Sequence, residues 1–134
     1  MLKKVITYTD YNGVERTETF YFNLSKSELM RKEMSTAGGL TEKIKRISET
    51  LDAPEIMSIF EDLVLSSYGV KSDDGKRFIK SKQLSEEFMQ TEAYDKLYME
   101  LITDSKAAAE FFKGVIPADA AAELEKQNHP ALQR

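Results

Sequence analysis

The segment with the most chemically suggestive side chains runs from Tyr68 to Ser81 and reads YGVKSDDGKRFIKS. A calcium loop of the EF-hand type needs oxygen ligands at alternate positions, glycine at the sixth and glutamate at the twelfth. With Gly75 in sixth place, Val70 and Ser81 occupy the two ends, so both end ligands are missing. A single glycine also cannot form the glycine-rich cradle of a phosphate loop. The segment therefore predicts a polar turn with Gly75 at positive φ, after a helix that ends at Gly69.

Other residues that carry catalysis in proteins are scarce in this chain. His129 is the single histidine and stands beside Pro130 in a polar C-terminal segment, and the chain has no cysteine. Glu86 and Glu87 are adjacent, so on a helix their carboxylates point in different directions. No nucleophile, base or metal-ligand set emerges. The sequence predicts a protein that is not an enzyme and that uses no cofactor and no metal.

The composition narrows the class of protein further. A chain of 134 residues fits one domain, expected over residues 1–127, with a hairpin at 1–24, a helical part at 25–127 and a mobile tail at 128–134. The formal net charge of −4 argues against sequence-independent nucleic-acid binding, which depends on phosphate neutralisation. No apolar stretch approaches membrane-spanning length, and the N-terminus does not resemble a signal peptide. We expect neither nucleic acid nor membrane as a partner.

The N-terminal part predicts an antiparallel β-hairpin. Two segments rich in Val, Ile, Thr, Tyr and Phe flank Asn12-Gly13, a dipeptide typical of a two-residue type I′ turn. Pairing about that turn sets Tyr11 opposite Val14 and Val5 opposite Phe20. Tyr8 and Tyr21 would then share the other face with Leu2 and Ile6.

Both faces of this predicted hairpin are partly apolar, and two explanations remain open. One face could pack on the helices while scattered tyrosines tolerate water. Alternatively, the second face or a strand edge meets another subunit or a client chain.

After Leu24 the pattern becomes helical, and the expected fold class is α+β: the hairpin followed by a bundle of about five or six short helices. Helix starts are indicated by the Ser25–Glu28 capping box, by Ser81 or Ser85, by Thr91 and by Asp104. Further helices are expected from near Thr41, from Asp52-Ala53-Pro54-Glu55 and after Pro117.

Aromatic side chains supply the candidate interaction residues. Phe111 and Phe112 are adjacent, so both cannot lie on one narrow helical stripe, and one of them is a candidate for a partner interface. The candidate protein-binding residues are Tyr8, Tyr11, Tyr21, Phe111 and Phe112. The six methionines could contribute to an adaptable hydrophobic surface, but core filler is the default expectation.

Three segments resemble a known family. ITYTDYNGVERTETFYFNLSKSEL, SYGVKSDDGKRFIKS and FMQTEAYDKLYMEL are similar to tail assembly chaperones of long-tailed bacteriophages and prophages of Gram-positive bacteria. The order Tyr68, Gly69, Lys71, Ser72, Asp74, Gly75 and Phe78 is the most distinctive part. The similarity extends from about Thr7 to Pro117.

The resemblance implies a non-enzymatic role in tail assembly. Such chaperones bind the long, helical tape measure protein, keep it soluble and help recruit tail tube subunits. The expected partners are therefore the tape measure and tail tube proteins, with self-association through strand edges as a further option. The expected location is the host bacterial cytoplasm, with the protein absent from the mature virion. The rival interpretations are a structural tail completion or connector protein and a small phage regulatory or host-interaction protein.

Overall fold

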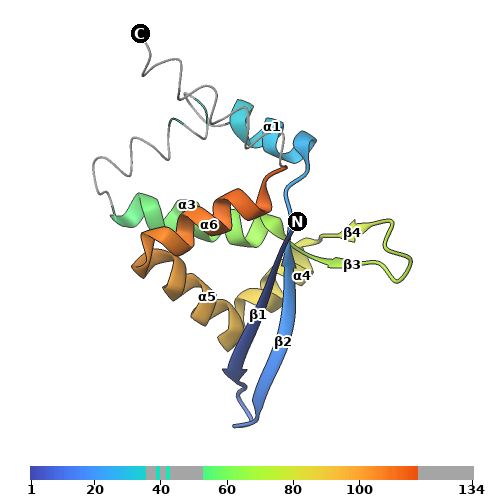
Figure 1. Ribbon diagram of the computed structural model, residues 1–134, viewed down its shortest axis with the longest axis vertical. Helices are drawn as coiled ribbons and strands as arrows, with labels where there is room; N and C mark the ends of the chain where they lie inside the picture. Colours follow the sequence, from blue (N-terminus) through green and yellow to red (C-terminus); the bar gives the residue numbers. More distant parts are fainter. Residues whose placement is uncertain (36–38, 40–41, 43–52, 118–134) are drawn as a thin grey trace.

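The computed structural model describes residues 1–35, 39, 42 and 53–117 and has the predicted α+β class. An N-terminal hairpin precedes the helices, and two short strands lie between α3 and α4 in the chain (Figure 1). The elements are β1 (Leu2–Thr9), β2 (Glu15–Phe22), α1 (Lys26–Ser35), α3 (Ala53–Ser67), β3 (Tyr68–Lys71), β4 (Phe78–Ile79), α4 (Lys82–Met89), α5 (Glu92–Thr103) and α6 (Ser105–Val115). The helices expected near Thr41 and after Pro117, and the tail at 128–134, lie outside the described residues.

The hairpin forms at the predicted place, but its register differs by one residue from the prediction. Thr9 pairs with Glu15, and Val5 pairs with Thr19 rather than with Phe20. The turn is a three-residue loop closed by Asp10 and Val14, with Gly13 at φ 79° and its N–H donating to the Asp10 carbonyl. The prediction of a two-residue type I′ turn was therefore wrong. The observed loop has three residues, and the last of them, Gly13, has left-handed backbone angles.

The Asp10 side chain explains why the longer loop is favoured. Its Oδ1 accepts hydrogen bonds from the backbone N–H groups of Asn12, at 2.9 Å, and Val14, at 3.0 Å. Its Oδ2 is 2.5 Å from Nε of Arg16. These contacts hold the pKa of Asp10 below its usual value, first through the Arg16 hydrogen bond and then through the Val14 N–H.

The corrected register changes which side chains share a face. A one-residue shift of a strand moves its side chains to the opposite face. Phe20 and Phe22 therefore join Ile6 and Tyr8 on the face that packs against the helices, and Tyr21 lies on the opposite face. The prediction that Tyr8 and Tyr21 share a face was wrong.

The segment first interpreted as a connector forms a second hairpin. β3 pairs with β2 through Tyr21–Gly69 and Phe22–Tyr68, and β4 pairs with β3, so the sheet order is β1-β2-β3-β4. Gly75 has φ 73° in the loop, as predicted. Gly69 does not end a helix, because α3 already ends at Ser67.

Gly69 has a packing role instead. A Cβ on this residue would lie 2.6 Å from Cε2 of Phe78 and 2.9 Å from the carbonyl oxygen of Ile79. Glycine allows the Phe78 ring to lie against the strand backbone.

The predicted caps position the helices that cover the sheet. Ser25 and Glu28 form the capping box, with Ser25 N–H donating to Glu28 Oε1 at 3.0 Å and Glu28 N–H to Ser25 Oγ at 3.2 Å. Ser81, rather than Ser85, caps α4, and Thr91 and Asp104 cap α5 and α6. Each cap satisfies backbone donors that a helix N-terminus leaves unpaired.

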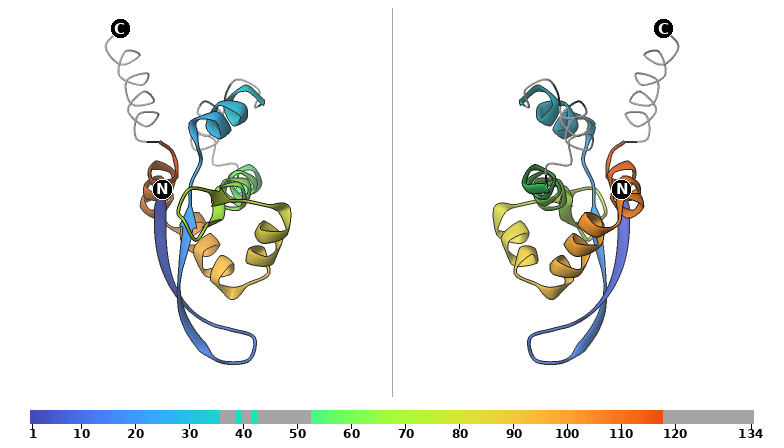
Figure 2. Two further views of the ribbon diagram at one scale, coloured as in Figure 1. Left: turned by 90° about the vertical axis from the view of Figure 1, so that its right-hand side faces the viewer. Right: turned by 90° about the vertical axis from the view of Figure 1, so that its left-hand side faces the viewer.

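The core lies between the sheet and the helical layer, where Figure 2 shows α3, α4 and α5 on one side of the hairpin. Its centre is aromatic. The Phe22 ring lies 5.3 Å from Phe111 and 5.8 Å from both Tyr68 and Phe88, between ring centroids. Tyr68 and Phe88 stack at 4.3 Å. These contacts join side chains from β2, β3, α4 and α6 in one cluster.

Candidate protein-interaction site

Two of the five predicted interaction residues lie in the core. Phe111 is 3% exposed and packs on Phe22. Tyr8 is 8% exposed, and its hydroxyl donates a hydrogen bond to Glu18. That hydrogen bond, with burial and the charge of Glu18, raises the pKa of Tyr8. Both rings are therefore largely buried.

The other three predicted residues lie on separate parts of the surface. Phe112 is half-buried against the core. Tyr21 is half-buried on the outer face of the sheet, where Lys71 Nζ lies 4.3 Å from its ring centroid. Tyr11 is 77% exposed at the tip of the first hairpin. The five residues therefore do not form one site.

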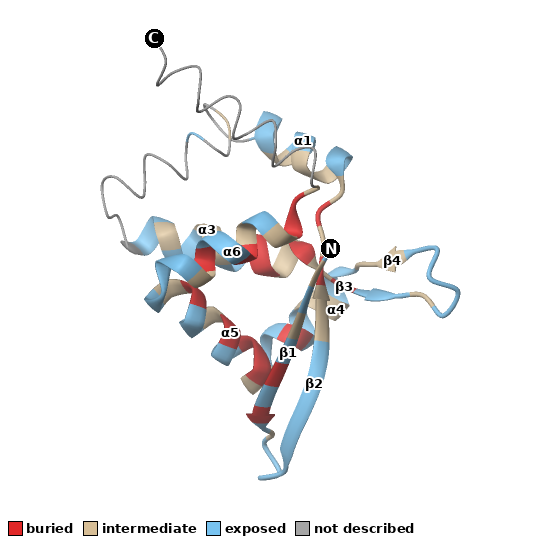
Figure 3. Ribbon diagram, viewed as in Figure 1, coloured by how far each residue is buried: buried red, intermediate tan, exposed pale blue. Residues whose placement is uncertain are grey.

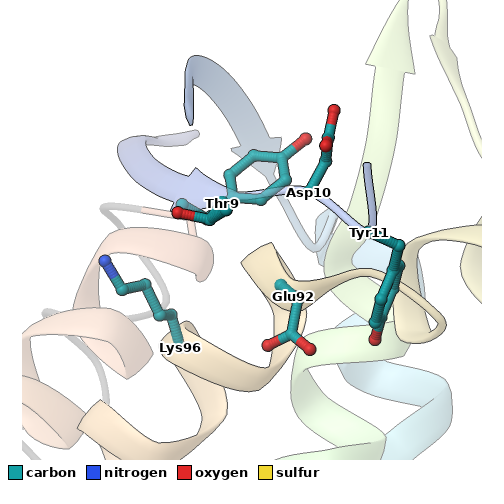
Figure 4. A pocket seen from close by; sticks show the side chains of 6 residues that line it. Thr9, Asp10, Tyr11, Glu92 and Lys96 are labelled. Carbon is teal, nitrogen blue, oxygen red and sulfur yellow. The ribbon is translucent and has the colours of Figure 1, made fainter. Parts of the chain in front are cut away.

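An open hollow of about 350 Å³ separates the hairpin tip from α5, and Figure 4 shows the side chains around it. Interaction with the Glu92 side chain raises the pKa of Tyr11, and Lys96 Nζ donates to the Thr7 carbonyl oxygen at 2.5 Å. The Lys96 hydrogen bond ties β1 to α5. The hollow contains no pair of groups arranged for acid–base or nucleophilic chemistry.

The clearest feature of the surface is the exposure of the methionine side chains. All six are exposed, from 39% for Met89 to 81% for Met34. The prediction of methionine as core filler was wrong, because aromatic and branched aliphatic side chains fill the core instead. Methionine is flexible and polarizable, and it is over-used on surfaces that bind varied apolar partners.

Helix α1 carries the two most exposed methionines. Met30 and Met34 are 64% and 81% exposed, and their i,i+4 spacing places them on one side of the helix. No residue of α1 is fully buried, although Leu29 packs against the core. Figure 3 shows α1 as an exposed and intermediate element above the buried layer.

Ion pairs attach α1 to the rest of the molecule. Lys32 Nζ lies 2.7 Å from Asp62 on α3, and Lys80 Nζ lies 2.8 Å from Glu28 and 2.6 Å from the Asn23 carbonyl oxygen. Burial alone would raise the pKa of Glu28, but hydrogen bonds from Lys80 and Ser25 lower it overall. The helix is thus held mainly by polar contacts, and its methionine side is left to solvent.

The loop with Asp73 and Asp74 is a turn in this structure. Asp74 Oδ1 accepts from Ser72 Oγ at 2.6 Å and from the Lys76 N–H at 3.0 Å. These bonds, led by that of Ser72, lower the pKa of Asp74. Within residues 1–35, 39, 42 and 53–117, no group of three or more acidic, histidine or cysteine side chains is arranged to hold a metal ion.

Exposed methionines and a sheet face left uncovered in the described part of the chain are features found on protein-binding surfaces. Residues 1–134, the whole chain, match the family model described as phage tail assembly chaperone. The chain belongs to this family. No curated protein and no solved structure matches it significantly.

Family membership assigns the chaperone to bacteriophage tail assembly and confirms the resemblance inferred from the three segments. It favours an assembly factor over an enzyme. No helix in the described part of the chain is long and apolar enough to cross a bilayer.

The sequence suggested a methionine surface only as the second interpretation, because exposure is not encoded in residue type. One signal was available: Met30 and Met34 are spaced i,i+4 on a helix whose mean hydropathy is low. On such a helix an apolar pair is as well suited to a partner as to the core.

Proposed function

We propose that this chaperone binds the tape measure protein, keeps it soluble and assists assembly of the tail tube around it. It acts without catalysis in the host bacterial cytoplasm and leaves before the virion is complete. The single observation that carries the proposal, beyond family membership, is the exposure of Met30 and Met34 on one side of α1.

The Met30–Met34 pair on α1 is the proposed client contact. A long helical client presents apolar side chains at i, i+3, i+4 and i+7, which an exposed apolar helix side can accommodate. Unbranched methionine side chains can adapt to successive, non-identical segments of such a client.

The test is capture of tape measure protein after co-expression. Burying a methionine side chain contributes roughly 1.5–3 kcal/mol when complete, and partial burial at an interface contributes less. Replacing both Met30 and Met34 by Ser should therefore weaken capture by about tenfold or more. The circular dichroism spectrum should not change, because neither side chain is in the core.

Met99→Ser is the matched control. Met99 is 48% exposed on α5, on a different element from the proposed contact. It should retain wild-type capture. Equal capture by the α1 double variant and wild type would contradict the assigned contact.

Mass spectrometry of purified phage particles tests the assembly role. A chaperone is expected to be absent from them. A stoichiometric amount in particles would instead favour a tail completion or connector protein.

A further inference from the structure

The outer face of the β1–β2 hairpin has no helix packed on it in the described structure, and most of its side chains are exposed (Figure 3). The register places alternate residues of both strands on this face. They are Lys3, Val5, Thr7, Thr9, Glu15, Thr17, Thr19 and Tyr21. Four of these eight are threonines, so the face is largely uncharged between its two ends.

A basic and aromatic strip lies at the end of this face near β3. Lys3 is paired directly across from Tyr21, and Lys71 reaches the same ring from the other side, with its Nζ 4.3 Å from the centroid. Neither lysine forms an ion pair with any other described residue. Two cations on either side of an aromatic ring are thus left uncompensated on a chain of net charge −4.

The floor of the strip is apolar. Val5 is 60% exposed, and Phe78 is half-buried with its ring against Gly69, the residue that pairs with Tyr21. Lys80 Nζ lies 5.7 Å from the Phe78 centroid, but Glu28 already neutralises it.

Carboxylates near the strip do not cancel its charge. Glu15 lies at the far end of the face, beside the turn. Asp74 is engaged in the β3–β4 loop by Ser72 and the Lys76 N–H, and exposed Asp73 shares that loop with exposed Lys76 and Arg77.

We propose that this strip is a second docking surface, which binds an acidic amphipathic helix of a protein partner. The helix lays its apolar stripe over Val5, Tyr21 and Phe78, and its carboxylates pair with Lys3 and Lys71. Charge complementarity selects an acidic occupant, and an uncovered sheet face can pack against the apolar side of a helix. The Lys71–Tyr21 contact holds one cation in place before binding, which lowers the cost of ordering it.

This inference rests on the proposed function for its partner class, a helical assembly client. It differs from the α1 contact in chemistry, because the α1 contact is apolar and insensitive to salt, whereas the strip depends on ion pairs that salt weakens. The two surfaces can therefore be tested independently.

The experiment compares two charge-reversal variants of the full chain. K3E/K71E reverses the strip, and K106E/K113E makes the same change in net charge on exposed lysines of α6. The probes are co-expressed tape measure protein and two synthetic amphipathic helical peptides, one with glutamate and one with lysine on the polar side. K3E/K71E should bind the acidic peptide and the client about tenfold more weakly at low salt, and K106E/K113E should bind as wild type.

Amide shifts in an NMR titration with the acidic peptide should centre on Val5, Tyr21 and Lys71. Wild-type affinity of K3E/K71E, or equal binding of the acidic and basic peptides, would overturn the inference. Suppose that K3E/K71E loses DNA binding or self-association but keeps peptide binding. The strip would then bind nucleic acid or a second copy of the chain, and not the acidic helix proposed above. If M30S/M34S abolishes client capture while K3E/K71E does not, the proposed function stands and this surface fails.

Discussion

Tyr94 shows how one side chain couples burial to protonation in this protein. It is 8% exposed between α3 and α5, and its ring stacks on Tyr98 at 5.6 Å. Burial, followed by the charge of Glu61, raises its pKa to about 12. The neutral phenol is therefore favoured in the folded state, and the phenolate is disfavoured.

Tyr94 should make stability fall at high pH. Its unfolded pKa is about 10, so its contribution is fully present below pH 10. Between pH 10 and 12 the folded state binds more protons than the unfolded state, so the free energy of unfolding decreases with pH, by up to about 1.4 kcal/mol per unit. Urea unfolding of wild type and Tyr94→Phe across this range provides the measurement.

The phenylalanine variant keeps the ring and removes the ionisable group, so its stability should fall less steeply with pH. Tyr8, Tyr68 and Tyr98 also have raised pKa values, and they remain in both proteins. Identical slopes for the two proteins would show that Tyr94 does not contribute.

At the scale of elements, the second hairpin depends on a close approach between strands. β4 has two residues, and β3 joins β2 through two paired positions. Few backbone pairings between strands therefore hold this hairpin in place. Packing of Phe78 against Gly69 compensates for the short strands. This is why glycine stands at a strand position that would otherwise favour a branched or aromatic residue.

Gly69→Ala should destabilise the protein by about 1–3 kcal/mol. The Phe78 ring can rotate away from an added methyl group, but the Ile79 carbonyl at 2.9 Å cannot move without shifting the ladder. The loss is measured by urea unfolding. G69A/F78A should therefore not recover wild-type stability.

Gly75→Ala provides a contrast at the tip of the same hairpin. An added Cβ there meets no atom within 4 Å, so any loss comes from the φ of 73° alone. If G69A and wild type unfold at the same urea midpoint, the close approach of Gly69 to Phe78 and Ile79 is not required for stability.

At the scale of the whole molecule, Phe22 joins elements from three parts of the chain. It is fully buried, and its ring contacts Tyr68, Phe88 and Phe111. Residues from β2, β3, α4 and α6 thus share one cluster. Such a core is expected to unfold as one unit, which is the domain organisation predicted for residues 1–127.

Phe22→Ala should cost about 3–5 kcal/mol, a large part of the stability of a domain of this size. Val5→Ala, on the exposed outer face, should change stability by less than about 0.5 kcal/mol. Urea unfolding followed by circular dichroism and by tyrosine fluorescence should give coincident transitions for wild type. Two separate transitions would contradict a single domain.

Local interactions were predictable from the sequence because they depend on residues within a few positions of one another. The capping box at Ser25 and Glu28, the caps at Thr91 and Asp104, and the turns at Gly13 and Gly75 all lie where the sequence indicates. The order of residues around Asp73-Asp74 also pointed to the family.

The tertiary structure alone decided which side chains are buried and which remain exposed. Asp10 lengthens the first turn by one residue, and that small change places Tyr21 on the outer face with Lys3. The exposure of all six methionines depends on aromatic residues from distant segments filling the core first. Burial depends on which elements meet, and elements far apart in sequence meet only in the folded chain.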